Sequence, residues 1–151
     1  MKRRIGNSDL ELTSIAFGAW AAGGWMWGHT EAGDAISAMK SAIDAGCTTI
    51  DTAPIYGQGT SEILVGEAIK GYDRSKIQIL TKFGMRWDTT EGDFAFNSQD
   101  NDGQPIAIHK YASKASIIKE CENSLQRLGT DYIDLYQIHW NDVTTPIEES
   151  F

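Results

Sequence analysis

Two patterns of apolar residues alternate along the chain. Short runs with little helical periodicity, each bounded by turn-forming residues, predict strands. These runs occupy residues 14–18, 48–50, 77–81 and 131–140. The last run lies between a helix stop at Leu128 and Gly129 and a helix start at Thr145 and Pro146. We therefore expect it to be a buried parallel strand.

Longer stretches with apolar residues three or four positions apart predict a helix after each of the first three strands. Serine and threonine residues precede these stretches and glycines follow them, as is typical of helix caps and stops. The expected caps are Thr30, Thr60 or Ser61, and Ser113, and the expected stops are Gly46, Gly71 and Gly129. A fourth helix begins within residues 145–149.

Strands that alternate with helices form βαβ units with parallel strands and right-handed crossovers. No G-x-G-x-x-G fingerprint follows the first strand, so a Rossmann domain is the weaker interpretation. An α/β fold of the TIM (β/α)8 barrel type is the stronger one. Residues 2–13, with a polar turn at residues 6–9, are expected to form a small β-hairpin ahead of this fold.

The stretch from residue 83 to residue 112 shows no periodicity and is rich in Asp, Asn, Gly and Gln. A loop of this length in a compact domain is usually functional or partly disordered. We expect a lid or rim on the substrate side, flexible over residues 89–104.

The composition is that of a globular protein, with 41% hydrophobic and 23% charged residues. No apolar run approaches the roughly 20 residues of a membrane span, and no signal peptide precedes the fold, so we expect a cytoplasmic protein. Cys47 and Cys121 are too few and too scattered for a disulfide framework or a zinc site. The formal net charge of −8 argues against a nucleic-acid partner. It also leaves few cations to hold the phosphates of a dinucleotide.

Polar side chains stand where three of the predicted strands end. Asp51 follows the second strand with Tyr56 just beyond it, Lys82 follows the third strand, and His139 lies at the end of the fourth. A parallel α/β sheet gathers its chemistry at the carboxyl ends of its strands. We therefore expect these four side chains to meet.

Together the four residues are suited to protonating an oxygen atom. Tyrosine, with an ordinary pKa near 10, is a poor acid unless a nearby cation favours its phenolate, and Lys82 can supply that cation. Asp51 is the natural partner of a lysine in such a place. His139 can orient and polarise a substrate carbonyl beside Tyr56. No nucleophile is evident in the sequence, and a hydride from a bound nicotinamide would fill that role.

Each of these residues also has an ordinary structural explanation. Asp51 can serve a turn, Lys82 can extend from a strand end to solvent, and His139 and Tyr56 can simply pack. Four polar groups at one end of three strands are less easily explained by chance. A metal site using Asp51 and His139 is the competing interpretation, which the charge of Lys82 and the lack of further ligands disfavour.

Three tryptophans lie within eight residues of a glycine-rich loop after the first strand: Trp20, Trp25 and Trp27. Core packing explains one of them, but a pocket wall explains the group better, because ligand sites are rich in aromatic side chains. We expect Trp25, Trp27, Trp87 and Trp140 to form an aromatic-walled pocket for apolar or sugar-like carbonyl compounds.

Three motifs resemble the signatures of the aldo-keto reductase family, in the bacterial branch that also resembles potassium-channel β subunits. They are Asp-Thr-Ala-Pro-Ile-Tyr-Gly at residues 51–57, Ile-Leu-Thr-Lys at residues 79–82, and Asp-Tyr-Ile-Asp-Leu-Tyr-Gln-Ile-His-Trp at residues 131–140. The resemblance covers the whole chain. It implies a TIM barrel closed at its bottom by the N-terminal hairpin, of which residues 14–151 supply four β/α units with the fourth helix truncated.

The same resemblance implies the roles of the site residues. Tyr56 would be the general acid, Lys82 and Asp51 the pair that tunes it, and His139 the residue that orients the carbonyl group. Gly18, Ala19, Trp20 and Asp51 would lie beside the nicotinamide of NADPH. The substrates would be small aldehydes or ketones, and no metal is implied. The preference for NADPH over NADH rests on the resemblance alone.

A complete (β/α)8 barrel needs about 250 residues, so the resemblance also implies that the second half of the barrel is absent. That half carries most of the cofactor anchors. An isolated half-barrel has open strand edges and an uncovered face. We expect either a truncated piece of a longer enzyme, which the break one turn into the fourth helix favours, or two copies that close the sheet as a homo-oligomer.

Two functions therefore remain open. The first is NADPH-dependent reduction of aldehydes or ketones, represented here by its catalytic half. The second is a non-catalytic half-barrel that self-associates and binds a small ligand or a protein partner. The substitution Tyr56→Phe separates them, because it should abolish reduction but leave ligand binding nearly intact.

Overall fold

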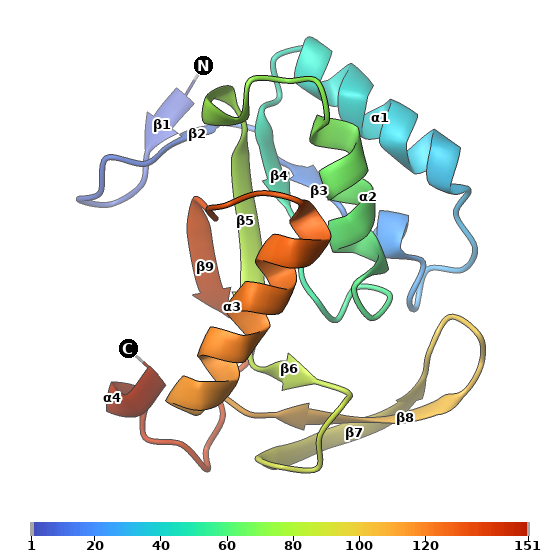
Figure 1. Ribbon diagram of the computed structural model, residues 1–151, viewed down its shortest axis with the longest axis vertical. Coiled ribbons are helices and arrows are strands. Elements are labelled where there is room, and N and C mark those ends of the chain that lie inside the picture. Colours follow the sequence, from blue (N-terminus) through green and yellow to red (C-terminus); the bar gives the residue numbers. More distant parts are fainter. Residues whose placement is uncertain (1, 151) are drawn as a thin grey trace.

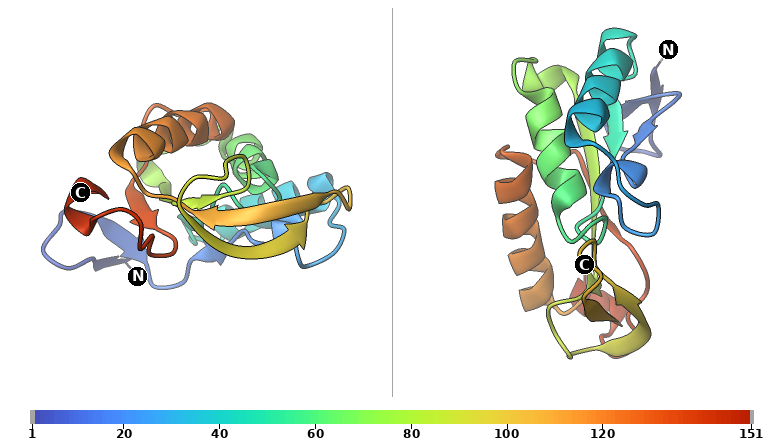
Figure 2. Two further views of the ribbon diagram at one scale, coloured as in Figure 1. Left: turned by 90° about the horizontal axis from the view of Figure 1, so that it is seen from below. Right: turned by 90° about the vertical axis from the view of Figure 1, so that its right-hand side faces the viewer.

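A curved sheet of four parallel strands forms the centre of the molecule in the computed structural model, which describes residues 2–150. Its strands lie in the order β3 (Phe17–Gly18), β4 (Thr49–Asp51), β5 (Gln78–Phe83) and β9 (Leu135–Ile138). Three helices lie along one face of the sheet (Figure 1, Figure 2): α1 (Ala32–Asp44), α2 (Thr60–Ile69) and α3 (Lys114–Leu128). Short 3-10 turns, η1 (Ala21–Gly23) and η2 (Arg74–Lys76), complete the connections.

The core between the sheet and these helices is apolar. Met39 of α1, Ile50 of β4, Val65 of α2 and Ile79 of β5 are completely buried in one cluster. Burying each of these side chains contributes about 1.5–3 kcal/mol. The apolar residues from which the strands and helices were predicted are thus the ones that form this core.

Two of the three expected helix caps are wrong. Helix α1 begins at Ala32 after Glu31, and the Thr30 hydroxyl instead donates a hydrogen bond to the Ala21 carbonyl oxygen at 3.0 Å. Helix α2 begins at Thr60 itself, after Gly59, whose positive φ of 97° suits a glycine. The Thr60 and Ser61 hydroxyls donate to the Gly57 and Ala19 carbonyl oxygens, each at 2.7 Å, so neither caps α2.

The third cap is confirmed. The Ser113 hydroxyl accepts a hydrogen bond from the Ser116 N–H at 3.3 Å, and Gly129 ends α3 with a φ of 64°.

The expected N-terminal hairpin is present as β1 (Lys2–Arg4) paired with β2 (Glu11–Thr13). It lies at the amino end of the parallel strands (Figure 1). The Thr13 N–H donates to the Thr49 hydroxyl at 2.9 Å, which joins the hairpin to the start of β4.

The expectation that residues 83–112 form a loop without regular secondary structure is wrong. This stretch folds into a three-stranded antiparallel sheet of β6 (Met85–Arg86), β8 (Pro105–Lys110) and β7 (Asp93–Gln99). It crosses the carboxyl end of the parallel strands (Figure 2). The strands carry apolar residues two positions apart, a pattern masked by their many polar neighbours.

The last parallel strand is shorter and less buried than expected. Only Leu135–Ile138 forms β9, and all four residues are half-buried, because β9 has β5 on one side and no strand on the other among residues 2–150. A short helix, α4 (Ile147–Ser150), follows. Among the described residues, no helix is long and apolar enough to cross a membrane.

Candidate active site

Lys82 is the centre of a polar cluster at the carboxyl end of β5. Its Nζ atom lies 3.0 and 2.9 Å from the two carboxylate oxygens of Asp51 and 2.8 Å from the Thr52 carbonyl oxygen. The Tyr56 hydroxyl oxygen lies 3.3 Å from the same nitrogen. The ammonium group thus has an ion pair and two further oxygen partners.

The strand register explains why Asp51 and Lys82 meet. Asp51 is the last residue of β4 and stands opposite Leu80 of β5, so Lys82, two residues further, projects from the same face of the sheet. The lysine side chain is only 14% exposed, against 33% for Asp51. A lysine this far from water requires a charged partner, and Asp51 provides it.

His139 approaches the cluster from the end of β9. Its backbone N–H donates to the Phe83 carbonyl oxygen at 2.9 Å, and its ring stands edge-on to the Tyr56 ring with the centroids 5.6 Å apart. Burial, together with the charge of Lys82, lowers the pKa of His139 to about 4. The imidazole is therefore neutral at neutral pH.

Tyr56 lies in the turn after β4, with only 8% of its surface exposed. Trp20 is stacked on its ring, with the centroids 5.5 Å apart and an angle of 17° between the planes. The structure thus brings together all four polar residues that the sequence singled out, Asp51, Tyr56, Lys82 and His139, and adds an aromatic neighbour.

The residues expected beside a nicotinamide border this cluster. Gly18 stands opposite Asp51 in the β3–β4 pairing, is exposed, and has no atom within 4 Å of the position a Cβ would take. Ala19 is fully buried, and its N–H donates to the Asp51 carbonyl oxygen at 2.8 Å. The loop that follows β3 (residues 19–28, the first loop) therefore leaves open space in front of Asp51.

The four tryptophans expected to line a pocket lie in different surroundings. Trp27 and Trp140 are exposed, and Trp87 is half-buried against the apolar cluster around Tyr56. Trp27 meets Trp20 edge-on, with the centroids 5.7 Å apart. Trp25 is buried, so of the four it is the one that belongs to the core of this cluster.

The β6–β8 sheet contributes residues that sequence reasoning missed. Met85 of β6 and Ile108 of β8 are buried in the same cluster as Tyr56. Phe96 of β7 contacts both Trp25 and Trp140, with centroid distances of 6.4 and 5.9 Å. The Phe-Ala-Phe and Ile-Ala-Ile alternation at residues 94–96 and 106–108 was the signal that could have revealed them.

Three cations at this end of the sheet are paired with carboxylates. Lys82 pairs with Asp51, Arg86 with Asp88, and Lys110 with Asp93. None of these three is available to bind a phosphate group. Among residues 2–150, no group of three or more His, Cys, Asp or Glu residues is arranged to hold a metal ion.

The chain is similar in sequence to known proteins. The sequence profile described as "Aldo/keto reductase family" matches residues 14–151. The chain belongs to the aldo/keto reductase family. The expected α/β fold is thereby confirmed as part of the TIM barrel of these reductases.

Individual relatives match almost the whole chain. Aldo-keto reductase YhdN of Bacillus subtilis is 42% identical over 147 residues, which are 97% of this chain and 40% of that protein. The NADH-specific methylglyoxal reductase of Escherichia coli is 38% identical over 151 residues, covering 97% and 44%. The solved glycerol dehydrogenase AKR11B4 from Gluconobacter oxydans is 39% identical, with a TM-score of 0.79, covering 99% and 42%. The chain thus spans about two fifths of the length of these relatives.

Proposed function

We propose that the protein acts in the NADPH-dependent reduction of aldehydes or ketones to alcohols, with Tyr56 as the proton donor. The single observation that carries this proposal is the contact of Lys82 Nζ with both the Asp51 carboxylate and the Tyr56 hydroxyl. A binding module has no use for a buried lysine that joins a carboxylate to a phenol.

The chemistry follows from what this cluster stabilises. When the Tyr56 proton moves to a substrate oxygen, negative charge develops on the phenolic oxygen, and Lys82 lies 3.3 Å from it. Asp51 holds the ammonium group in that position. A fixed cation in a partly desolvated site stabilises such charge more than water does, because it needs no reorganisation.

His139 is suited to orient the carbonyl group. Its imidazole is neutral, since its pKa is lowered to about 4, so it can donate one N–H hydrogen bond without adding positive charge beside Lys82. A carbonyl oxygen held by both His139 and Tyr56 is polarised before the proton moves.

The exposed aromatic side chains support an apolar or aromatic carbonyl compound as substrate. Trp20, Trp27 and Trp140 are exposed; Trp20 stacks on Tyr56 and meets Trp27 edge-on, and the three rings offer apolar surface to a substrate. Trp87 is half-buried against the apolar cluster that contains Trp25 and Tyr56.

The residues present fit one part of the cofactor. Gly18 has open space where a Cβ would stand, and Trp20 is exposed and stacked on Tyr56. These two residues, with Asp51 and the buried Ala19 beside them, would hold the nicotinamide, which when bound supplies the hydride. For the phosphate groups of the cofactor, Lys82, Arg86 and Lys110 offer no comparable binding site, since each of these cations is paired with a carboxylate. NADH is the alternative cofactor, because the Escherichia coli relative is named an NADH-specific reductase.

The substitution Tyr56→Phe tests the proposal. It removes the phenolic proton and leaves the ring, so NADPH-dependent reduction of an aromatic aldehyde should fall by at least about 100-fold. Binding of NADPH, followed by tryptophan fluorescence, should change little. Tyr132→Phe is the matched control, because Tyr132 is exposed and packs against Arg74 instead. Equal rates for wild type and Tyr56→Phe would refute the assigned role.

A second candidate function is self-association of a non-catalytic half-barrel. The edge strands β3 and β9 each have a single partner strand among residues 2–150, and Ile15 and Val143 are exposed close to them in sequence. Unpaired strand edges favour association with another chain. A concentration-dependent mass in sedimentation, without carbonyl reduction, would support this candidate over the first.

A further inference from the structure

The turn of the β7–β8 hairpin contacts the first loop of the molecule. Asp100 fixes this turn, because its carboxylate accepts the N–H groups of Asp102 and Gln104 at 2.9 and 2.8 Å. The turn presents Asn101, whose Nδ2 donates to the Gly23 carbonyl oxygen at 2.8 Å. This hydrogen bond joins residues 78 positions apart in the chain.

Gly23 in turn lies directly against the backbone of Tyr56. A Cβ at Gly23 would be 2.4 Å from the Tyr56 carbonyl oxygen, and a Cβ at Gly57 would be 2.0 Å from the Gly23 carbonyl oxygen. The same Cβ at Gly57 would lie 3.0 Å from Asn101 Nδ2. Asn101, Gly23 and the Tyr56–Gly57 backbone therefore form one close-packed contact.

The turn after Tyr56 is a conformation that needs such support. Gly57, Gln58 and Gly59 have φ values of 70°, 50° and 97°, so three successive residues are left-handed and the middle one is not glycine. A left-handed non-glycine residue costs about 1 kcal/mol and persists where the surrounding structure holds it.

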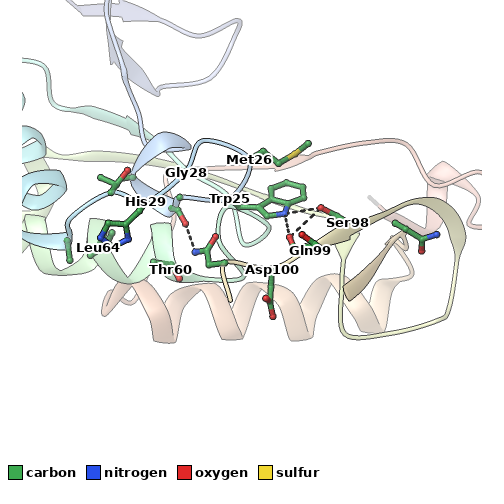
Figure 3. A pocket seen from close by; sticks show the side chains of 16 residues that line it. Trp25, Met26, Gly28, His29, Thr60, Leu64, Ser98, Gln99 and Asp100 are labelled. Atoms are coloured by element: carbon green, nitrogen blue, oxygen red, sulfur yellow. Dashed lines mark hydrogen bonds between the residues drawn. The ribbon is translucent and has the colours of Figure 1, made fainter. Parts of the chain in front are cut away.

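The hairpin holds the first loop at a second point. The Trp25 indole N–H lies 3.0 Å from the Gln99 carbonyl oxygen and 3.3 Å from the Ser98 hydroxyl (Figure 3). A hollow of about 840 Å³ opens between the hairpin, the first loop and α2. The hairpin and the loop are thus joined by hydrogen bonds at two separate points, and by the stacking of Phe96 on Trp25.

We propose that Asn101 is a positioning residue for Tyr56. Through Gly23 it holds the turn at residues 57–59, and that turn sets where the Tyr56 hydroxyl meets Lys82. The inference rests on the proposed function in one respect, namely that Tyr56 is the proton donor. The contact of Asn101 with Gly23 and the Tyr56–Gly57 backbone does not depend on Tyr56 being the proton donor.

Amide hydrogen exchange tests the contact without cofactor or substrate. The Gly59 and Ser61 N–H groups are bonded to Pro54 and Tyr56 carbonyl oxygens at 2.7 and 3.1 Å, so they report on this turn. Asn101→Asp replaces the donor with an acceptor that faces a carbonyl oxygen. We expect exchange of these two amides to become about tenfold faster.

Asn97→Ala is the matched control, and a core amide is the internal reference. Asn97 is exposed on β7, and its side chain hydrogen-bonds to no other described residue, so its removal should leave the exchange unchanged. The Val65 amide in α2 should keep its rate in both variants. Unchanged exchange at Gly59 and Ser61 in Asn101→Asp, or an equal rise at Val65, would overturn the proposal. If Asn101→Asp does not fold, Asn101→Ala takes its place with the same readouts.

A spectroscopic readout separates positioning from a merely structural role. With tyrosine labelled at ¹³Cζ, the resonance that Tyr56→Phe removes should shift in Asn101→Asp in the same direction as in Lys82→Met, and should stay in place in Asn97→Ala. No shift in Asn101→Asp would contradict positioning. Failure of carbonyl reduction would refute the proposed function and leave these shifts as they are, so the two failures are distinguishable.

Discussion

Lys82 illustrates how single residues of this chain acquire their properties from the strand ends that carry them. On its own it is an ordinary strand-end lysine, but the pairing of β4 with β5 places its ammonium group against Asp51 and Tyr56. The sequence predicted this meeting because parallel strands deliver their last residues to one place. It did not predict the stacking of Trp20 on Tyr56, since that contact depends on the path of the glycine-rich loop.

The charge state of His139 is a prediction at this scale. Its ring NMR signals should titrate with a midpoint of about 4, because burial and the nearby Lys82 ammonium disfavour the imidazolium. Lys82→Met should raise the midpoint but leave it below the ordinary value of 6.5, since burial is the larger cause and remains. Lys110→Met, which removes a lysine paired with Asp93, should leave it in place. A wild-type midpoint near 6.5 would contradict the buried position of the ring.

At the scale of elements, the sequence identified regular strands and helices better than it identified their ends and connections. The caps of α1 and α2 were misassigned because hydroxyl side chains bond equally well to loop carbonyl groups, as Thr30 does. The β6–β8 sheet was missed because polar residues dominate it, and its alternation covers only one face. Tertiary contacts with Tyr56 and Trp25, which no local pattern encodes, stabilise it.

The entry to β9 depends on a buried ion pair. Asp134 accepts hydrogen bonds from Arg74 Nη2 at 2.7 Å and from the Ile79 N–H at 2.9 Å, and the two charged side chains are 15% and 19% exposed. Asp134→Ala should lower the free energy of unfolding by about 3 kcal/mol, because it leaves a largely buried guanidinium unpaired. Urea denaturation measures this. Asp9→Ala, which breaks an exposed pair with Arg4, should cause no measurable change, and an equal loss in both variants would contradict the account.

Glu120 anchors the base of the β6–β8 sheet and should make stability depend on pH. Its carboxylate accepts the Gly84 N–H at 3.1 Å, between β5 and β6, and lies near Arg86 and Tyr136. Burial raises the pKa of Glu120 to about 7 from an ordinary 4.5, although Gly84 and Arg86 favour the charged form. The folded state therefore retains a proton that the unfolded chain releases, and the contribution of Glu120 to stability should fall by about 3 kcal/mol as the pH rises from about 4.5 to 7. His139, whose pKa is lowered to about 4, contributes the opposite dependence over nearly the same range, so the wild-type profile should be nearly flat.

Urea denaturation across this range tests the assignment. Glu120→Gln keeps an acceptor for the Gly84 N–H and does not titrate, so the falling contribution should disappear and stability should rise as the pH increases from about 4.5 to 6.5. The opposite dependence from His139 should then emerge: its lowered pKa means that the unfolded chain binds the proton, and stability is lost as pH drops from 6.5 towards 4. An unchanged profile in Glu120→Gln would show that another group titrates.

At the scale of the whole molecule, the chain forms part of a barrel and spans about two fifths of the length of its relatives. The fold class could be predicted because the alternation of strands and helices is strong and the strand-end motifs are specific. The surroundings of the tryptophans could not, because burial of Trp25 and exposure of Trp27 depend on where the β7–β8 hairpin lies.

The most direct test of the central claim is the fate of the hydride. The wild-type chain is incubated with an aromatic aldehyde and NADPH deuterated at the transferable position, and the product is examined by NMR. The account predicts an alcohol with one deuterium on the former carbonyl carbon, formed by the wild type and not by Tyr56→Phe. Unreacted aldehyde in the wild-type sample, with NADPH bound or unbound, would contradict it.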